Sequence, residues 1–190
     1  MKKVSIEASN RFCPQTLFLY GTYKEDGSPN FGLFCWFSYY WDKELGVMTC
    51  IGGEKLTKDR IKAGNAFSAN LVTEALLPLA DYLGNNDGYD PQKMNIPIEV
   101  EKGAVLPVPI LKDSPWIFEL SVKQSIPTDD GEVFLCQVKN TLVAAELEDK
   151  SLSIKEQMKT AAPVITMGEM RYFSINPTPI AEWGKWKEFK

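Results

Sequence analysis

The first third of the chain alternates dense apolar runs with short polar turns. Residues 16–23 combine aromatic, Thr and other apolar residues, and a cluster rich in turn-forming residues follows at 24–30. Two further runs, residues 31–41 and 45–51, are mostly apolar or aromatic and end before two glycines. Such runs between turn-forming residues predict strands joined into an antiparallel meander. Strands that are apolar on both faces are expected to lie between two layers of protein, or between the core and a partner.

Two short helices are expected next. Thr57 can cap a first helix that Gly64 ends, and the apolar run at residues 66–72 predicts another strand. Thr73 can cap a second helix that extends to about residue 83. Pro78 falls within this second helix, so a kink or a break is expected there.

The second half of the chain has mostly β patterning. Residues 116–123 and 132–147 predict long strands around an Asp-Asp-Gly turn, and residues 171–175 predict a late strand before Trp183 and Trp186. Roughly seven strands with two or three short helices predict a mainly β protein, a β-barrel decorated by short helices. A doubly wound sheet is excluded because strands and helices do not alternate regularly. The length and the lack of a long linker suit a single domain over residues 1–190.

Composition narrows the classes of partner. The chain has 21 Lys and Arg against 25 Asp and Glu, which gives a net charge of −4. Because there is no basic block, nucleic acid and anionic membranes are disfavoured as main partners. No run approaches the length of a transmembrane helix, and the N-terminus lacks the apolar region of a signal peptide. A soluble, cytoplasmic protein is therefore expected.

The chain contains no histidine. This excludes Ser–His and Cys–His nucleophile pairs, imidazole metal ligands and a histidine general base. Cys13, Cys35, Cys50 and Cys136 lie singly with no C-x-x-C spacing, so neither a zinc site nor a disulfide scaffold is predicted. Buried free thiols in a reducing compartment are expected instead. No metal site is expected, and no side chain is nominated as catalytic.

A candidate phosphate site lies at the start of the first predicted helix. The glycine-rich fingerprints of dinucleotide folds and P-loops are absent. At residues 55–60, Lys55, Thr57 and two further cations surround a helix N-terminus whose free backbone N–H groups can bind an anion. The alternative is an ordinary capped surface helix with solvated charges.

Two further features could serve a cofactor. Six aromatic residues between Phe34 and Trp41 follow Asn30 and could hold a planar heterocycle, although core packing accounts for most such rings. Lys93 ends a polar loop at residues 84–93. A lysine there could stabilise negative charge on a redox cofactor, and the alternative is a plain surface loop.

Taken in this order, the segments resemble the flavin reductase-like family of FMN-binding split barrels, and within it the flavoredoxin-like branch. The resemblance covers about residues 13–183. It rests on the order and spacing of five motifs: Gly27-Ser28-Pro29-Asn30, Cys35-Trp36-Phe37-Ser38, Lys55-Leu56-Thr57-Lys58-Asp59-Arg60-Ile61, Ser68-Ala69-Asn70-Leu71 and Asp90-Pro91-Gln92-Lys93. Some relatives carry a histidine near the turn before the long second-half strand, where this chain has Asp130-Gly131-Glu132-Val133.

The resemblance implies a six-stranded split barrel that binds one FMN without a covalent bond, usually as a homodimer with the flavin near the subunit interface. By the same analogy, Lys55 and Thr57 hold the phosphate, and the segment from Cys35 to Ser38 runs beside the ring and the ribityl chain. The cofactor-binding residues that it implies are Asn30, Cys35, Trp36, Phe37, Ser38, Lys55, Thr57 and Lys93.

The leading hypothesis is an FMN-containing oxidoreductase that takes hydride from NADH or NADPH and passes electrons to free flavin or a small acceptor. It agrees with the missing histidines, because a flavin carries the chemistry itself. One alternative is a non-enzymatic FMN electron carrier that a protein partner reduces. Another is a β-barrel that binds a pyridoxal-type cofactor or haem, the latter disfavoured because no histidine can ligate the iron.

Overall fold

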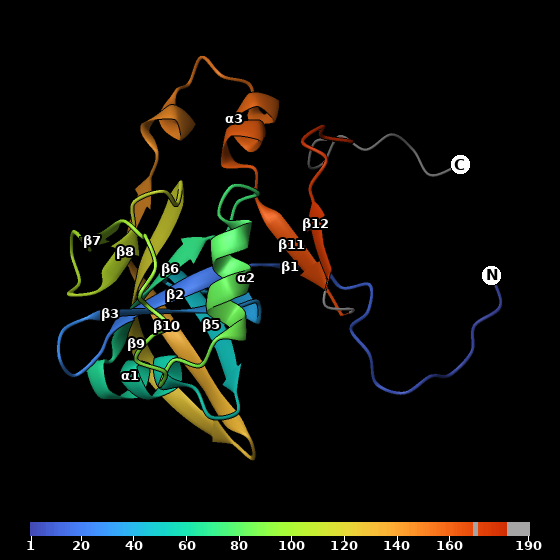
Figure 1. Cartoon of the computed structure of the whole chain (residues 1–190). Helices are drawn as coiled ribbons and strands as arrows, with labels where there is room; N and C mark the ends of the chain where they lie inside the picture. Colours follow the sequence, from blue (N-terminus) through green and yellow to red (C-terminus); the bar gives the residue numbers. More distant parts are fainter. Residues whose placement is uncertain (169–170, 182–190) are drawn as a thin grey trace.

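Seven antiparallel strands form the main sheet, drawn in Figure 1 from a computed structural model. The structure describes residues 1–168 and 171–181, so Trp183 and Trp186 lie outside the described residues. The order across the sheet is β3-β2-β6-β9-β10-β5-β4. The strands are β2 (Phe18–Tyr23), β3 (Pro29–Phe34), β4 (Phe37–Asp42), β5 (Glu44–Gly52), β6 (Ala66–Leu71), β9 (Trp116–Thr128) and β10 (Gly131–Val143).

The two edge strands of this sheet are consecutive in the chain, which requires the sheet to curl into a barrel. Only Cys35 and Trp36 connect β3 at one edge with β4 at the other. Inside the barrel, the Tyr20 and Thr49 hydroxyls are 2.6 Å apart, although β2 and β5 are not neighbours in the sheet. The predicted mainly β barrel with short helices is confirmed.

The single strand predicted at residues 31–41 is wrong, because the chain breaks at Cys35 and Trp36. The Trp36 carbonyl accepts hydrogen bonds from the Cys50 N–H (3.2 Å) and the Thr49 hydroxyl (2.9 Å), which holds the break against β5. The main sheet therefore has seven strands instead of the six that the resemblance implies. Aromatic residues continue through the break, so the pattern does not reveal it.

The first predicted helix is α1 (Leu56–Gly64), which follows β5. It begins before Thr57, so Lys55 occupies the N-cap position and Thr57 lies buried in the first turn. The predicted capping by Thr57 is therefore wrong. The helix ends at Gly64 as predicted, and Asn65 takes the left-handed conformation that terminates it, with φ of 52°.

The second predicted helix is α2 (Leu77–Asn85). Leu76 occupies the N-cap position without a side-chain cap, so the predicted capping by Thr73 is wrong; the Thr73 hydroxyl instead accepts the Leu76 N–H (3.2 Å) in the turn before the helix. Pro78 lies in the first turn, where its missing N–H would have no helical partner. The predicted kink or break is therefore wrong, and α2 lies against the barrel beside β3 (Figure 1).

The second half extends the predicted strands and adds smaller elements. β9 and β10 form a long hairpin, and β10 ends at Val143, earlier than predicted. The smaller elements are the strand pair β7 (Val100–Lys102) and β8 (Pro109–Leu111), the 3-10 helix η1 (Ala145–Glu148), the helix α3 (Ile154–Ala161), and a three-stranded sheet of β1 (Gln15–Thr16), β11 (Val164–Met167) and β12 (Arg171–Ser174). In the described residues no helix is long and apolar enough to cross a bilayer.

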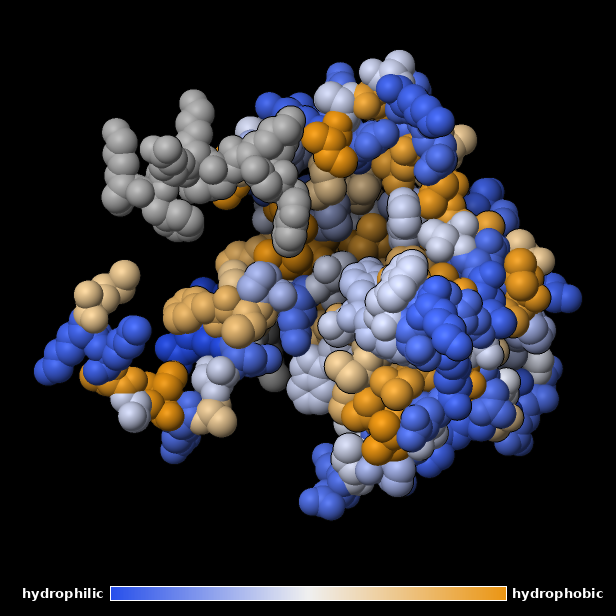
Figure 2. Space-filling model, turned by 180° about the vertical axis from the view of Figure 1, so that it is seen from behind, coloured by the Kyte–Doolittle hydropathy of each residue, from blue (hydrophilic) through white to orange (hydrophobic). Residues whose placement is uncertain are grey.

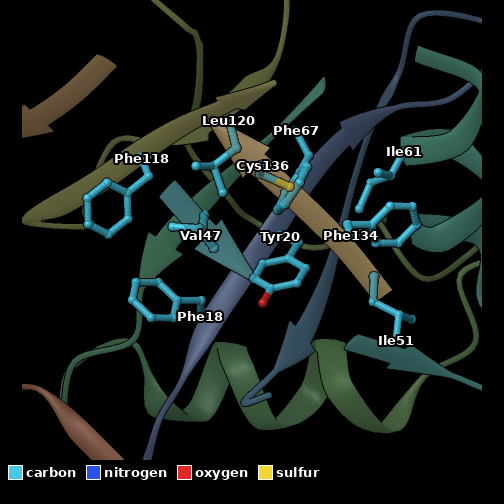
Figure 3. Packing of buried hydrophobic residues seen from close by; sticks show 11 residues of the cluster. Phe18, Tyr20, Val47, Ile51, Ile61, Phe67, Phe118, Leu120, Phe134 and Cys136 are labelled. Carbon is cyan, nitrogen blue, oxygen red and sulfur yellow. The ribbon is translucent and has the colours of Figure 1, made fainter. Parts of the chain in front are cut away.

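Two apolar clusters stabilise this arrangement. One fills the barrel with side chains from β2, β5, β6, β9, β10 and α1, and Figure 3 shows Tyr20 among Phe67, Phe134 and Ile51. The other lies between α2 and the outside of β2 and β3, with Leu19 and Leu83 among its members. Because the second cluster anchors α2 and the loop after it, it fixes the position of the loop that carries Lys93.

Candidate functional site

Seven of the eight residues implied by the resemblance lie at or beneath two separate hollows. Trp36, Phe37 and Ser38 line a pocket of about 450 Å³ on the outside of β4 and β5. A second, much smaller cavity of about 50 Å³ lies between α1, β3 and the end of α2. Lys55, Thr57 and Lys93 line this cavity, and Asn30 lies buried beside it.

The small cavity is built around the N-terminus of α1. No side chain caps this helix at Lys55, so the N–H groups of its first turn remain available to another acceptor. Thr57 places its hydroxyl there from the first turn. A helix N-terminus with a cation beside it attracts anions, since the aligned peptide dipoles leave partial positive charge at this end.

Lys93 is the most unusual residue of the small cavity. Lys93 is only 3% exposed, and its ammonium makes no hydrogen bond to the described residues, although the nitrogen itself stays accessible from the cavity. Burial is the main reason that its pKa falls to about 8. The nearby positive charges of Lys55 and Lys24 also lower this pKa, and Asp87 opposes them. A buried cation without a hydrogen-bond acceptor is suited to binding an anion or an electron-rich oxygen.

Asn30 supplies a second unpaired polar atom. Its amide nitrogen donates to the hydroxyls of Thr57 (3.0 Å) and Thr22 (3.3 Å), so its orientation is fixed by two partners. Its Oδ1 is buried and has no hydrogen-bond partner in the part of the chain that the structure describes. A carbonyl oxygen needs a donor, which a fully ionised phosphate does not provide but a sugar-alcohol hydroxyl does. Asn30 therefore fits a hydroxyl-bearing chain better than it fits the phosphate itself.

Two glycines that were not predicted as site residues line the small cavity and leave room that a side chain would fill. A Cβ at Gly32 would lie 2.9 Å from the Thr57 hydroxyl and 2.9 Å from the Phe34 ring. A Cβ at Gly88 would lie 2.8 Å from Leu56 and 3.4 Å from Asn30 Oδ1. A glycine inside an aromatic strand is itself a signal of close approach, so Gly32 could have been found from the sequence.

The larger pocket has a mixed aromatic and polar wall. Trp36 is 51% exposed and stands at its edge, whereas the Phe37 ring stacks on Phe18 with 4.3 Å between centroids and so belongs mainly to the barrel core. Ser38 pairs in register with Met48, and both side chains line the pocket. The wall is completed by residues before and within β1 and by Thr49, Cys50 and Val133.

Cys35 lies apart from both hollows. It lines a third depression with Tyr172 and Asp81, where the Tyr172 hydroxyl donates to the Asp81 carboxylate (2.6 Å). Burial raises the pKa of the Cys35 thiol. The structure therefore does not bring this side chain together with the other predicted residues.

The two hollows differ in volume, so they suit chemical groups of different size. Since about 10–15 Å³ of such internal space holds one water, the cavity of about 50 Å³ has room for a small head group but not for a ring system. The pocket of about 450 Å³ lies within the usual range for small-molecule sites. Phe34 lines the cavity and Trp36 lines the pocket, so one short stretch of chain runs from one to the other.

Comparison with known proteins adds a family. The sequence matches the model of the flavin reductase like domain over residues 10–162, and no curated protein matches it. Flavoredoxin of Desulfovibrio vulgaris (Miyazaki F) has a similar structure, with a TM-score of 0.85 and 22% identity over 97% of this chain and 98% of that chain.

Two further solved structures are similar over most of their lengths. An FMN-binding protein from Thermus thermophilus, with bound p-hydroxybenzaldehyde, has a TM-score of 0.77 and 18% identity over 96% of this chain and 98% of that one. The styrene monooxygenase flavin reductase of Pseudomonas putida S12 has a TM-score of 0.69 and 15% identity over 90% and 96%. Since the matched region spans most of the chain and includes both hollows, this protein belongs to the flavin reductase like domain family.

Proposed function

We propose that this protein binds FMN non-covalently and acts as an oxidoreductase that accepts hydride from NADH or NADPH. The observation that carries this proposal is the largely buried Lys93 side chain, whose ammonium has no acceptor among the described residues and shares a cavity with Lys55 and the N-terminus of α1. Such a site suits an anionic or oxygen-rich ligand, because a poorly solvated charge without an acceptor is unfavourable.

Each proposed contact follows from the chemistry of the residue. Lys55, Thr57 and the first-turn N–H groups of α1 are suited to the phosphate, and Asn30 Oδ1 is suited to a ribityl hydroxyl. Lys93 can neutralise negative charge on either the phosphate or the ring. When bound, the isoalloxazine would supply reversible hydride acceptance, which needs no side-chain base or nucleophile.

The larger pocket is the proposed place for the ring. Its volume suits a planar heterocycle, and Trp36 offers an exposed aromatic face at its edge. The names of similar structures, which include an FMN-binding protein and a flavin reductase, support FMN and the reductase activity. The name flavoredoxin supports an electron carrier as the second candidate.

The first experiment tests the cofactor. Purified protein is freed of bound flavin and titrated with FMN, and the quenching of flavin fluorescence gives the affinity. A variant with Lys55→Ala and Thr57→Val should bind FMN at least tenfold more weakly, since charge-assisted hydrogen bonds contribute about 1.5–3 kcal/mol. Valine keeps the shape of Thr57, and Asn30 keeps Thr22 as an acceptor. Unchanged affinity would refute the phosphate assignment.

A matched control uses the same residue types elsewhere. Lys155→Ala with Thr160→Ala changes α3, which lies at the opposite end of the molecule from α1 in Figure 1. This control should bind FMN as the unchanged protein does. Equal losses in both variants would point to a general defect in folding rather than to the cavity.

The second experiment separates the enzyme from the carrier. FMN-loaded protein is mixed with NADH or NADPH without oxygen, and the visible flavin absorbance is followed. Bleaching within seconds to a few minutes, followed by reduction of added free flavin, supports the reductase. Absorbance that persists with both nicotinamides but bleaches in a cell extract supports an electron carrier that a protein partner reduces.

We also propose that the protein forms a homodimer. Four large apolar residues in or next to β4 and β5 are more than 40% exposed: Trp36 and Met48 beside the larger pocket, and Tyr39 and Trp41 on the other face of β4. Figure 2 shows hydrophobic residues in and around a recess on the face opposite to Figure 1; its hydropathy colours leave tryptophan and tyrosine pale, so the three aromatic residues do not stand out there. Exposed patches of this kind commonly mark interfaces. Sedimentation equilibrium should give twice the chain mass of 21.4 kDa, and the single mass would refute the dimer.

A further inference from the structure

Two of the four cysteines line the same pocket. Cys13 precedes β1 and Cys50 lies within β5, and both line the larger pocket beside Trp36 and Ser38. The other two thiols lie elsewhere, because Cys35 lines the depression beside α2 and Cys136 is buried in the barrel core. All four are free thiols as predicted, but only Cys136 is fully buried, so the predicted burial is wrong for the other three. The fold places at one pocket two thiols that the sequence separates.

Both thiols of this pocket can meet a small molecule. Cys13 is exposed, and Cys50 is half-buried. Along β5 the neighbours Thr49 and Ile51 are buried in the barrel, so Cys50 lies on the outward face, where the pocket is. Burial raises the pKa of Cys136 to about 12 and also raises the pKa of Cys35. Those two thiols are therefore poor nucleophiles.

The chain around Cys13 is held beside the pocket. The Cys13 N–H donates to the Asn10 carbonyl (2.8 Å), and Gln15, two residues on, pairs with Thr166 in the small sheet. Residues 1–14 contain no helix or strand, and Figure 1 shows this segment leaving the body beside β1. Two residues span at most about 7 Å, so the Cys13 thiol stays near the pocket.

We propose that Cys13 and Cys50 form a dithiol site that reduces small disulfides. The Cys13 thiolate attacks one sulfur of the substrate disulfide, which forms a mixed disulfide and releases the first thiol. The Cys50 thiolate then attacks the Cys13 sulfur, which closes a Cys13–Cys50 disulfide and releases the second thiol. Two protein thiols and one substrate disulfide become one protein disulfide and two substrate thiols, so two electrons and two protons pass to the substrate. The reaction needs no flavin and goes beyond the proposed reductase function; it takes place while the pocket is free of the ring, because the substrate and the ring would occupy the same space.

The pocket suits this class of substrate. Its volume of about 450 Å³ fits a small molecule and not a folded protein. The Ser38 side chain adds a hydroxyl to the wall, while Met48 and Val133 add apolar surface. Oxidised glutathione is a suitable probe because it is small, polar and symmetrical.

The test follows the thiols directly. Full-length reduced protein without flavin is treated with oxidised glutathione, remaining thiols are alkylated under denaturing conditions, and tryptic peptides are analysed by mass spectrometry. Each cysteine falls in its own tryptic peptide, at residues 12–24, 25–43, 44–55 and 124–139. The expected product is a disulfide between peptides 12–24 and 44–55, with Cys35 and Cys136 alkylated and no retained glutathione.

Single substitutions trap the intermediate. Cys50→Ser should leave glutathione attached to Cys13, because no second thiol can displace it. Cys35→Ser is the matched control and should still form the bridge between the two pocket cysteines. The wild-type result does not depend on the folding of any variant.

Three results would overturn the proposal. One is glutathione that remains on Cys13 or Cys50 of the wild-type protein without a bridge. Another is a bridge that includes Cys35 or Cys136. The third is a Cys13 disulfide between two chains, visible as a covalent dimer without reductant. A protein that fails to bind FMN but forms the Cys13–Cys50 bridge would refute only the cofactor.

Discussion

Replacing Lys93 with methionine should stabilise the flavin-free protein while weakening its ligand binding. Burial lowers the pKa of Lys93 from 10.5 to about 8, so the charged side chain is about 3 kcal/mol less favourable in the folded protein than in the unfolded chain. At pH 7 this penalty is fully present, since the lysine is charged in both states. Methionine has a similar length and no charge, so Lys93→Met removes the penalty.

The stabilisation expected for Lys93→Met should depend on pH, whereas a change in packing alone should not. Between about pH 8 and pH 10.5 the folded protein loses the Lys93 proton before the unfolded chain does, so the stability of the unchanged protein rises with pH. Above that interval the electrostatic advantage of Lys93→Met disappears. Urea unfolding of the flavin-free proteins at pH 7 and pH 10.5 measures both values.

Ligand binding should change in the opposite direction. If FMN supplies the missing acceptor, Lys93→Met loses a charge-assisted hydrogen bond, and its affinity at pH 7 falls about 10- to 100-fold. Lys102→Met on the exposed end of β7 is the control and should change neither property. The reasoning is refuted if Lys93→Met destabilises the flavin-free protein at pH 7 by the same amount as at pH 10.5.

Two further substitutions test how the fold supports the site. Glu119 is buried, and its carboxylate accepts hydrogen bonds from Asn140 and from three backbone N–H groups of residues 104–106. Glu119→Gln should therefore lower the free energy of unfolding by about 3 kcal/mol. Burial tends to raise the pKa of Glu119, but these hydrogen bonds hold it below 4.5. The contribution of Glu119 to the free energy of unfolding is therefore present above pH 4.5 and is lost on acidification. Unfolding measurements at pH 4 and pH 7 check this. Gly32→Ala should cost about 1–3 kcal/mol of stability and weaken FMN binding, since its Cβ would lie 2.9 Å from the Thr57 hydroxyl. A Cβ at Gly64 would meet open space, so Gly64→Ala should not lower the stability. Calorimetry on Gly32→Ala and Gly64→Ala compares the two.

Local signals in the sequence predicted most of the elements but not how they meet. The strand at residues 66–72, the helix ending at Gly64 and the hairpin around residues 129–131 follow from short-range patterning and turn residues. The missing histidines exclude imidazole chemistry on composition alone. The predictions were wrong where two local rules compete. Pro78, for example, is compatible both with the first turn of a helix and with a break in one.

At the candidate site, too, residues close in sequence could be predicted together, whereas residues brought together by tertiary contacts could not. Lys55 and Thr57 are neighbours in sequence, so one helix start predicts them together, whereas Lys93 could be placed beside them only by resemblance. Its burial depends on α2 and the loop that follows it. The resemblance also grouped Cys35 with Trp36, but successive side chains of an extended chain point to opposite sides, and the two line different hollows.

The sequence by itself determined the β-rich class, the two short helices, the lack of imidazole chemistry and the polar residues at the start of α1. These depend on composition and on interactions between residues close along the chain. Only the tertiary structure decided that the sheet closes through Cys35 and Trp36, that Lys93 is buried with no acceptor among the described residues, and that Cys13 and Cys50 line one pocket. Each of these results from contacts between residues far apart in sequence, which hydrophobic periodicity does not encode.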